Sequence, residues 1–140
     1  MGVNAVAVLD TMWDWRSMTT GAGYGAQAPR SYTINPENKS GKRLYQLLGD
    51  KKFVVTNACP QLVGGPNEKG TPDPNWLHDN ISDLYQRYKY KLLLVCGKVA
   101  WETYQRCGYR PKARVIRMKH PAARNWTRTE IQQWQRSLAQ

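Results

Sequence analysis

The sequence predicts an α/β fold, a three-layer α/β/α sandwich with a central four-stranded, mainly parallel sheet. Four short apolar runs, at 5–9, 53–56, 92–96 and 113–118, alternate with segments of helical periodicity. The first three runs are continuously apolar, which is typical of strands covered on both faces. A length of 140 residues indicates a single domain over residues 1–140.

The four predicted strands read AVAVL, FVVT, LLLVC and ARVIRM. They are rich in Val, Leu and Ile and are bounded by Gly, Pro, Asn or charged residues. The fourth run alternates apolar with basic residues, which predicts an edge strand. Right-handed crossovers through the intervening helices are expected to join the strands.

Helical patterns fill the intervals between the strands. The segment 40–49 places three leucines on one face and ends at Gly49, a residue suited to the position after a helix. The next helix is expected to begin with Asp73 as N-cap and Pro74 as its first residue. Its apolar positions recur at helical spacing, at Leu77, Ile81, Leu84, Tyr85 and Tyr88.

Two further helices are expected in the second half of the chain. One runs between Gly97 and Gly108. The other opens with Thr127 and, three residues on, Glu130, which together form a capping box. Its inward-facing residues are expected to be Ile131, Trp134 and Leu138.

The charge of the chain is strongly basic, at +11, and the excess is concentrated in its last third. From Arg106 to the C-terminus nine residues are basic and only Glu130 is acidic. Such a field attracts polyanions, nucleic acid above all or an anionic lipid surface. A merely soluble basic surface is the alternative.

Several classes of protein fit the sequence poorly. No run approaches the roughly 18 apolar residues of a membrane span, and the N-terminus does not read as a signal peptide. The three cysteines, Cys59, Cys96 and Cys107, have no paired-ligand spacing, which favours reduced thiols in a cytoplasm-like compartment. With two distant histidines, no metal site and no cofactor are expected, and a monomer is the default.

Polar residues lie where the predicted strands end. In an open parallel sheet ligands bind beyond the carboxyl ends of the strands, so Asp10, Asn57, Gly97 and His120 are expected to converge there. Taken singly, Asp10 could cap a loop, Asn57 could be a turn residue and His120 could be structural. Their shared placement favours a functional site. The long connections 10–36 and 57–73 support it, since such loops usually carry function.

Short motifs at these strand ends resemble those of the uracil-DNA glycosylase superfamily, most closely its single-strand-selective monofunctional branch. FVVTNACPQL at 53–62 resembles the strand that ends in Asn-x-Cys-Pro-Leu, and HPAARN at 120–125 resembles the His-Pro-Ser-Pro-Arg-Asn loop. LLVCGKVAWETYQRCGY resembles the third strand, glycine turn and helix. TTGAGYG at 19–25 resembles the glycine-rich segment that carries an aromatic below the base.

The resemblance implies a role for each matched residue. Asn57 would read the Watson–Crick edge of a flipped uracil, and Tyr24 would stack on the base. His120 would stabilise negative charge on the leaving base. Asp10 matches the carboxylate that positions or activates water in one branch of the family, and Asp14 is a competing candidate.

The resemblance also implies contacts with DNA, single- or double-stranded. Arg124 would lie in the loop that wedges into the DNA double helix. Lys119, next to His120, would contact a phosphate. Arg117 and Asn125 complete the expected DNA-binding set. Met12 stands where one branch of the family has a tyrosine that excludes the methyl group of thymine, so a substituted uracil is an alternative substrate.

Three hypotheses of function follow. The first is a monofunctional glycosylase, which removes uracil or a related pyrimidine from DNA by base flipping, and no lysine nucleophile is expected. The second is a catalytically silent protein that binds DNA or a nucleotide, motivated by the altered first motif LDTMWDW. The third is an α/β enzyme acting on a small nucleotide. A cytoplasmic, nucleoid-associated or nuclear location is expected.

Overall fold

A computed structural model describes residues 2–11, 28–61 and 70–140 of the chain. Its four strands, β1 (Ala5–Leu9), β2 (Phe53–Asn57), β3 (Leu92–Cys96) and β4 (Arg114–Met118), form one sheet in the order β2-β1-β3-β4. All three strand pairs are parallel. The predicted α/β class and sheet are therefore confirmed, and β4 is an edge strand as its alternating pattern predicts.

The other edge strand, β2, is continuously apolar because cores lie on both faces of the sheet, and its outer side is partly covered as well. Tyr32 forms an isolated antiparallel bridge with Val55, and each backbone N–H of the pair donates to the other's carbonyl at 2.9 Å. The segment before the bridge is fastened as well, since the Ala28 N–H donates to the Pro60 carbonyl. A continuously apolar run can therefore lie at an edge of this sheet.

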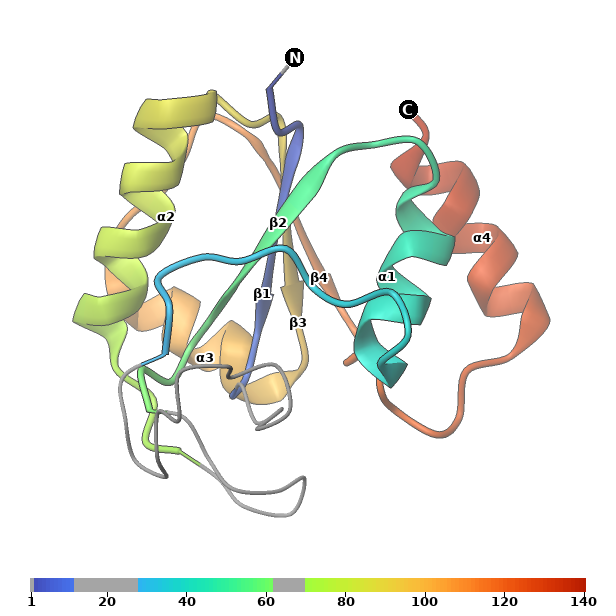
Figure 1. Cartoon of the computed structure of the whole chain (residues 1–140), viewed down its shortest axis with the longest axis horizontal. Coiled ribbons are helices and arrows are strands. Elements are labelled where there is room, and N and C mark those ends of the chain that lie inside the picture. The colour runs from blue at the N-terminus through green and yellow to red at the C-terminus, as the bar shows by residue number, and fades with distance from the viewer. Residues whose placement is uncertain (1, 12–27, 62–69) are drawn as a thin grey trace.

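Helices cover both faces of the sheet in the described structure (Figure 1). Helices α2 (Pro74–Tyr88) and α3 (Lys98–Cys107) pack on one face, and α1 (Lys39–Leu48) and α4 (Arg128–Leu138) on the other. The strand residues divide by alternation between two hydrophobic cores. The core beneath α2 and α3 contains Val6, Val8, Leu93 and Val95, and the core beneath α1 and α4 contains Ala5, Ala7, Leu9, Val55, Leu92 and Leu94.

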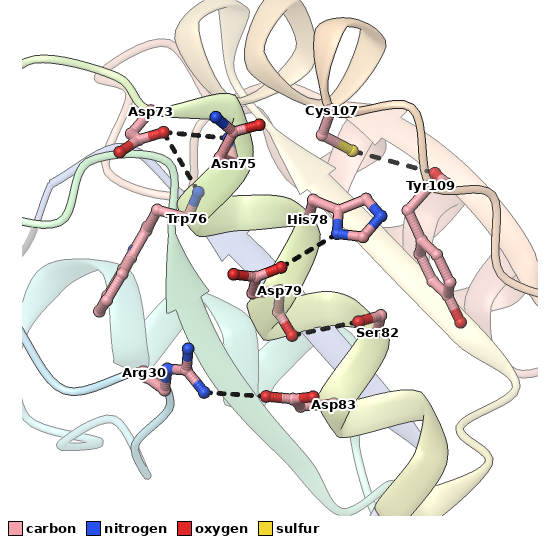
Figure 2. Close-up of polar contacts among 10 residues, drawn as sticks. All are labelled: Arg30, Asp73, Asn75, Trp76, His78, Asp79, Ser82, Asp83, Cys107 and Tyr109. Atoms are coloured by element: carbon pink, nitrogen blue, oxygen red, sulfur yellow. Dashed lines mark hydrogen bonds and ion pairs between the residues drawn. The ribbon is translucent and has the colours of Figure 1, made fainter.

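The ends of the helices follow the residue types that the sequence places there. Asp73 accepts hydrogen bonds from the N–H groups of Asn75 and Trp76, which caps α2 (Figure 2). Thr127 accepts from the Glu130 N–H and caps α4 in the same way. Gly49 follows α1 as predicted.

An ion pair links α2 to the segment that carries Tyr32. Arg30 contacts Asp83 at 2.9 Å (Figure 2). Both side chains are more than half exposed, so the pair adds little stability. The pair shows where this segment passes α2, two residues before the Tyr32 bridge.

Candidate active site

Four segments meet at the carboxyl edge of the sheet. The β1–β2 register pairs Leu9 with Asn57, which places Asp10 one residue beyond that pair. On the other side of β1, the Gly97 N–H donates to the Met118 carbonyl at 2.8 Å, so the ends of β3 and β4 also meet. The ends of the four strands therefore meet at one edge of the sheet, as predicted. The chemistry that is possible at this edge depends on the side chains there.

The imidazole of His120 is held in one tautomer by its own loop. The Ala122 N–H donates to Nδ1 of His120 at 3.0 Å. A ring nitrogen that accepts a hydrogen bond carries no proton, so the neutral ring has its proton on Nε2. Burial lowers the pKa of His120, opposed by the negative charge of Asp10. The residue is therefore a neutral donor near physiological pH.

Gly97 forms the surface against which this imidazole rests. Its backbone, at φ 93° and ψ 170°, lies in a region that is essentially restricted to glycine. A Cβ atom placed here would lie 3.4 Å from Cβ and 3.5 Å from Cδ2 of His120. Gly97 therefore forms the tight turn between β3 and α3, and the same residue leaves room for the histidine.

The loop after β4 is fastened to α4 through Lys119. Its ammonium lies 2.7 Å from a carboxylate oxygen of Glu130 and 3.0 Å from the Asn125 carbonyl, and 4.7 Å from the centre of the Trp126 ring. The Trp126 indole N–H in turn donates to the His120 carbonyl at 3.0 Å. We refer to Lys119, Asn125, Trp126 and Glu130 as the loop clamp, because together they fix the backbone that carries His120.

The carboxylate of Asp10 receives two hydrogen bonds on one oxygen. The Thr11 hydroxyl donates to Oδ1 at 3.1 Å and the Cys59 thiol donates to the same atom at 3.5 Å. The Asp10 carboxylate also acts electrostatically on His120. A negative charge and a hydrogen-bond donor thus lie near each other at this edge.

Asn57 is almost fully buried, with 1% of its surface exposed, and its amide faces Tyr32. The Tyr32 hydroxyl lies 3.3 Å from Oδ1 and 3.1 Å from Nδ2 of the amide. Burial raises the pKa of Tyr32 to about 12, so the hydroxyl stays protonated at neutral pH. It can donate to the amide oxygen or accept from the amide nitrogen.

The expected DNA-binding residues lie in two places. Arg124 and Asn125 are exposed in the loop that follows His120. Arg117 is exposed on β4, with its guanidinium carbon 5.4 Å from the centre of the Trp101 ring. Lys119 differs from these three, because its ammonium already has partners within the loop clamp.

Several expected residues lie outside the described part of the chain. Met12 and Tyr24 fall there, as does Asp14, the competing carboxylate. Among residues 2–11, 28–61 and 70–140, no group of three His, Cys, Asp or Glu side chains could hold a metal ion. No helix in these ranges is long and apolar enough to cross a membrane.

Three site residues were missed by reasoning from the sequence. Tyr32 lies 25 residues before Asn57, and no local pattern links the two. Thr11 and Cys59 could have been found from register, because Cys59 lies opposite Thr11, the residue after Asp10, if the parallel ladder continues past the strands. The Cys59 N–H does donate to the Asp10 carbonyl, at 3.0 Å.

The structure defines an α/β/α protein with polar residues gathered at the carboxyl edge of a parallel sheet, the edge at which open sheets of this kind bind ligands. The family model described as the uracil DNA glycosylase superfamily matches residues 17–139, and the chain belongs to this superfamily. Its members are usually DNA glycosylases, so membership suggests DNA glycosylase activity in general. No curated protein matches the chain significantly. Asn57 and His120 fall within the matched residues, whereas Asp10 precedes them.

Proposed function

We propose that the protein is a monofunctional DNA glycosylase that hydrolyses the N-glycosidic bond of uracil or a related pyrimidine in DNA. The observation that carries this proposal is the hydrogen bond from the Ala122 N–H to Nδ1 of His120. It leaves Nε2–H as a donor at the edge that also holds the Asp10 carboxylate. Superfamily membership independently supports chemistry on DNA.

The two groups suit the separation of charge in this reaction. When the bond between C1′ and the base breaks, the sugar becomes cationic and the base takes the electron pair. The Asp10 carboxylate would stabilise the sugar and orient the attacking water, while His120 would donate a hydrogen bond to the anionic base. Water then adds its oxygen to C1′, and its released proton balances the departing base.

The base must leave the stack of the DNA to reach this edge. Asn57 would recognise the base through its amide. The amide would first give up its hydrogen bond with the Tyr32 hydroxyl and then bond to the edge of the base. Tyr24 would stack on the ring, and Met12 would lie near position 5 of the pyrimidine. A methionine there is consistent with uracil or a 5-substituted uracil as the substrate.

The environment of Lys119 supports a monofunctional reaction. A bifunctional glycosylase needs a neutral amine that attacks C1′. The lysine next to His120 is ion-paired with Glu130 and only 24% of its side chain is exposed, so its amine already has a partner. We therefore propose water as the nucleophile and assign Lys119 to the loop clamp in preference to a phosphate.

Arg124, Asn125 and Arg117 would hold the DNA backbone beside the site. Arg124 and Asn125 are exposed in the loop that carries His120, and Arg117 is exposed on the neighbouring edge strand. Single-stranded DNA is the proposed preferred substrate, from the resemblance of the histidine loop and the Asn-x-Cys-Pro motif to the single-strand-selective branch. A base in a single strand is also the least costly to unstack.

The second candidate function is that of a catalytically silent DNA-binding protein. The pairing of the Asn57 amide with Tyr32 favours it, because this buried amide already has a hydrogen-bond partner within the protein. In that case DNA would bind across the basic edge without base release. The two candidates differ in one measurable product, the free base.

The test is base release from labelled oligonucleotides that contain one uracil, in single and double strands, followed by alkali. We expect alkali-dependent scission, faster on the single strand, and no scission without alkali. Asp10→Asn and His120→Ala should abolish it, whereas Asp50→Asn and His78→Ala serve as matched controls. No release of uracil, hydroxymethyluracil or a deaminated purine, with DNA binding retained, would establish the silent alternative.

A further inference from the structure

The surroundings of Asp10 contain a thiol with no assigned role. Cys59 is fully buried, and its Sγ lies 3.5 Å from Oδ1 of Asp10. The Thr11 hydroxyl reaches the same oxygen at 3.1 Å. Every side-chain hydrogen bond to this carboxylate from the described residues therefore falls on Oδ1.

The backbone holds Cys59 in this place. Its N–H donates to the Asp10 carbonyl at 3.0 Å, and the Ala58 N–H donates to the Leu9 carbonyl at 2.9 Å. The Ala58 bond continues the β1–β2 ladder past Asn57, and the Cys59 bond is a further contact with Asp10 itself. The backbone of Cys59 is thus held beside that of Asp10.

A second segment of the chain, at Gly70, passes close to Cys59. A Cβ atom at Gly70 would lie 2.9 Å from Cβ and 3.5 Å from Sγ of Cys59. The neighbouring Thr71 N–H donates to Oε1 of Gln61 at 3.1 Å, which ties this segment down. The close approach of Gly70 leaves Cys59 little freedom to turn away from Asp10.

The protonation of the thiol makes it a donor and excludes it as a nucleophile. Burial, with a contribution from the Asp10 carboxylate, raises the pKa of Cys59 to about 11. Reactive cysteines have the opposite property, a lowered pKa in a partly exposed, electropositive setting. At neutral pH the S–H group therefore persists and can donate to the carboxylate.

We propose that Cys59 is a positioning residue, whose thiol, together with the Thr11 hydroxyl, holds Oδ1 of Asp10 and directs Oδ2 toward the sugar of the bound nucleotide. The inference rests on the proposed function in one respect, the assumption that Asp10 is the carboxylate that faces C1′ of the sugar. A thiol is a weak donor, so it orients the carboxylate while leaving its negative charge available to a cation.

The test compares binding to two single-stranded oligonucleotides that carry a sugar analogue at one position. One analogue is a pyrrolidine, whose protonated nitrogen mimics the cationic sugar, and the other is an uncharged tetrahydrofuran. The ratio of the two affinities measures the electrostatic contribution of the carboxylate without any turnover. We expect the wild type to prefer the pyrrolidine and Cys59→Ala to reduce that preference about three- to tenfold.

Three variants separate positioning from packing. Cys107→Ala removes a buried thiol at the end of α3, away from Asp10, and should keep the full preference. Cys59→Ser restores a donor in a similar volume and should recover it. In an Asp10→Asn background, where the preference is already lost, Cys59→Ala should change nothing further.

The outcomes distinguish this inference from the proposed function. An unchanged preference in Cys59→Ala, an equal loss in Cys107→Ala, or no preference in the wild type would each overturn the positioning role. Uracil release is measured separately on the same proteins. A protein that releases no base but prefers the pyrrolidine through Cys59 would refute the proposed function and retain this inference.

Discussion

At the scale of single residues, the chemistry of this edge depends on which atoms already have partners. In His120 the Nδ1 atom is occupied by the Ala122 N–H, so Nε2 is the atom left as a donor. In Asp10 the Oδ1 atom is occupied by Thr11 and Cys59. Each group thus presents one atom, and the two atoms carry opposite electrostatic character.

The first prediction at this scale concerns the titration of His120. Its pKa is lowered by burial, so the ring should stay neutral below the usual histidine value of about 6.5. The same shift affects stability, because the unfolded chain binds the proton more readily than the folded protein does. The contribution of the neutral ring to the free energy of unfolding is therefore complete above the usual pKa, and it is lost as the pH falls through the lowered pKa of the folded protein. NMR of the ring protons in a His78→Gln protein, which retains one histidine, measures it directly. A midpoint above 6.5 would contradict a neutral donor.

The second prediction concerns the Tyr32 hydroxyl, which competes with a base for the Asn57 amide. Tyr32→Phe leaves a buried amide unpaired and should lower the free energy of unfolding by about 1–2 kcal/mol. Because a bound base would restore the missing partner, the variant should bind a uracil-containing strand several-fold more tightly. Denaturant unfolding and fluorescence anisotropy measure the two effects.

Tyr45→Phe is the control for this prediction. It removes a hydroxyl that donates to the Ile34 carbonyl at 3.1 Å, away from Asn57. It should cost stability without changing the affinity for uracil. Weaker binding in Tyr32→Phe would show that the hydroxyl assists the base and does not compete with it.

At the scale of elements, the strand-to-helix turn at Gly97 couples the fold to the site. Gly97→Ala should destabilise the protein by about 1–3 kcal/mol, because its backbone conformation is nearly exclusive to glycine. The added Cβ also presses on the His120 ring, so base release should fall further than the loss of folded protein explains. Thermal unfolding and single-turnover rates measure both.

Gly108→Ala is the control, because it introduces backbone strain without a contact between the new Cβ and His120. Gly108 is left-handed at φ 77°, and a Cβ there meets nothing within 4 Å. It should cost about 1–2 kcal/mol of stability while the rate per folded molecule stays unchanged. An equal loss of rate in both variants would mean that Gly97 acts through stability alone.

The loop clamp is the second device at this scale, since it joins the His120 loop to α4. The pKa of Glu130 is lowered, chiefly by its hydrogen bond with Lys119, so the pair is charged at neutral pH. Glu130→Gln should free the Lys119 ammonium and loosen the loop, reducing the rate of base release more than the affinity for DNA. Glu102→Gln removes the carboxylate of an exposed pair, with 3.9 Å between the charged atoms, and should change neither. Unaltered base release in Glu130→Gln would contradict the role of the clamp.

At the scale of the whole molecule, the sheet and the edge at which its polar residues gather were predictable from the chain. Continuous apolar runs identify buried strands, and parallel topology sends their polar successors to one edge. The contact of Tyr32 with Asn57 was not predictable, because it depends on an antiparallel bridge between a loop and an edge strand, and loops carry no periodic pattern. The ion pair of Lys119 with Glu130 was not predictable for a related reason. The local sequence pattern assigns Glu130 to the capping box of a helix, and nothing in that pattern indicates a second partner.

The last prediction concerns the distribution of charge over the molecule. A net charge of +11 would attract DNA to any face, whereas the proposed function requires the strand to lie at the carboxyl edge. Removing one cation that touches a phosphate lowers the slope of log Kd against log salt by about 0.7 for a single strand. Arg124→Ala should therefore reduce the slope by about that amount. Lys52→Ala removes the same charge before β2, at the opposite edge of the sheet, and should leave the slope unchanged. Equal reductions in the two variants would mean that DNA is held by the diffuse charge of the whole surface. The basic residues in the last third of the chain would then have no special role in placing DNA at the carboxyl edge.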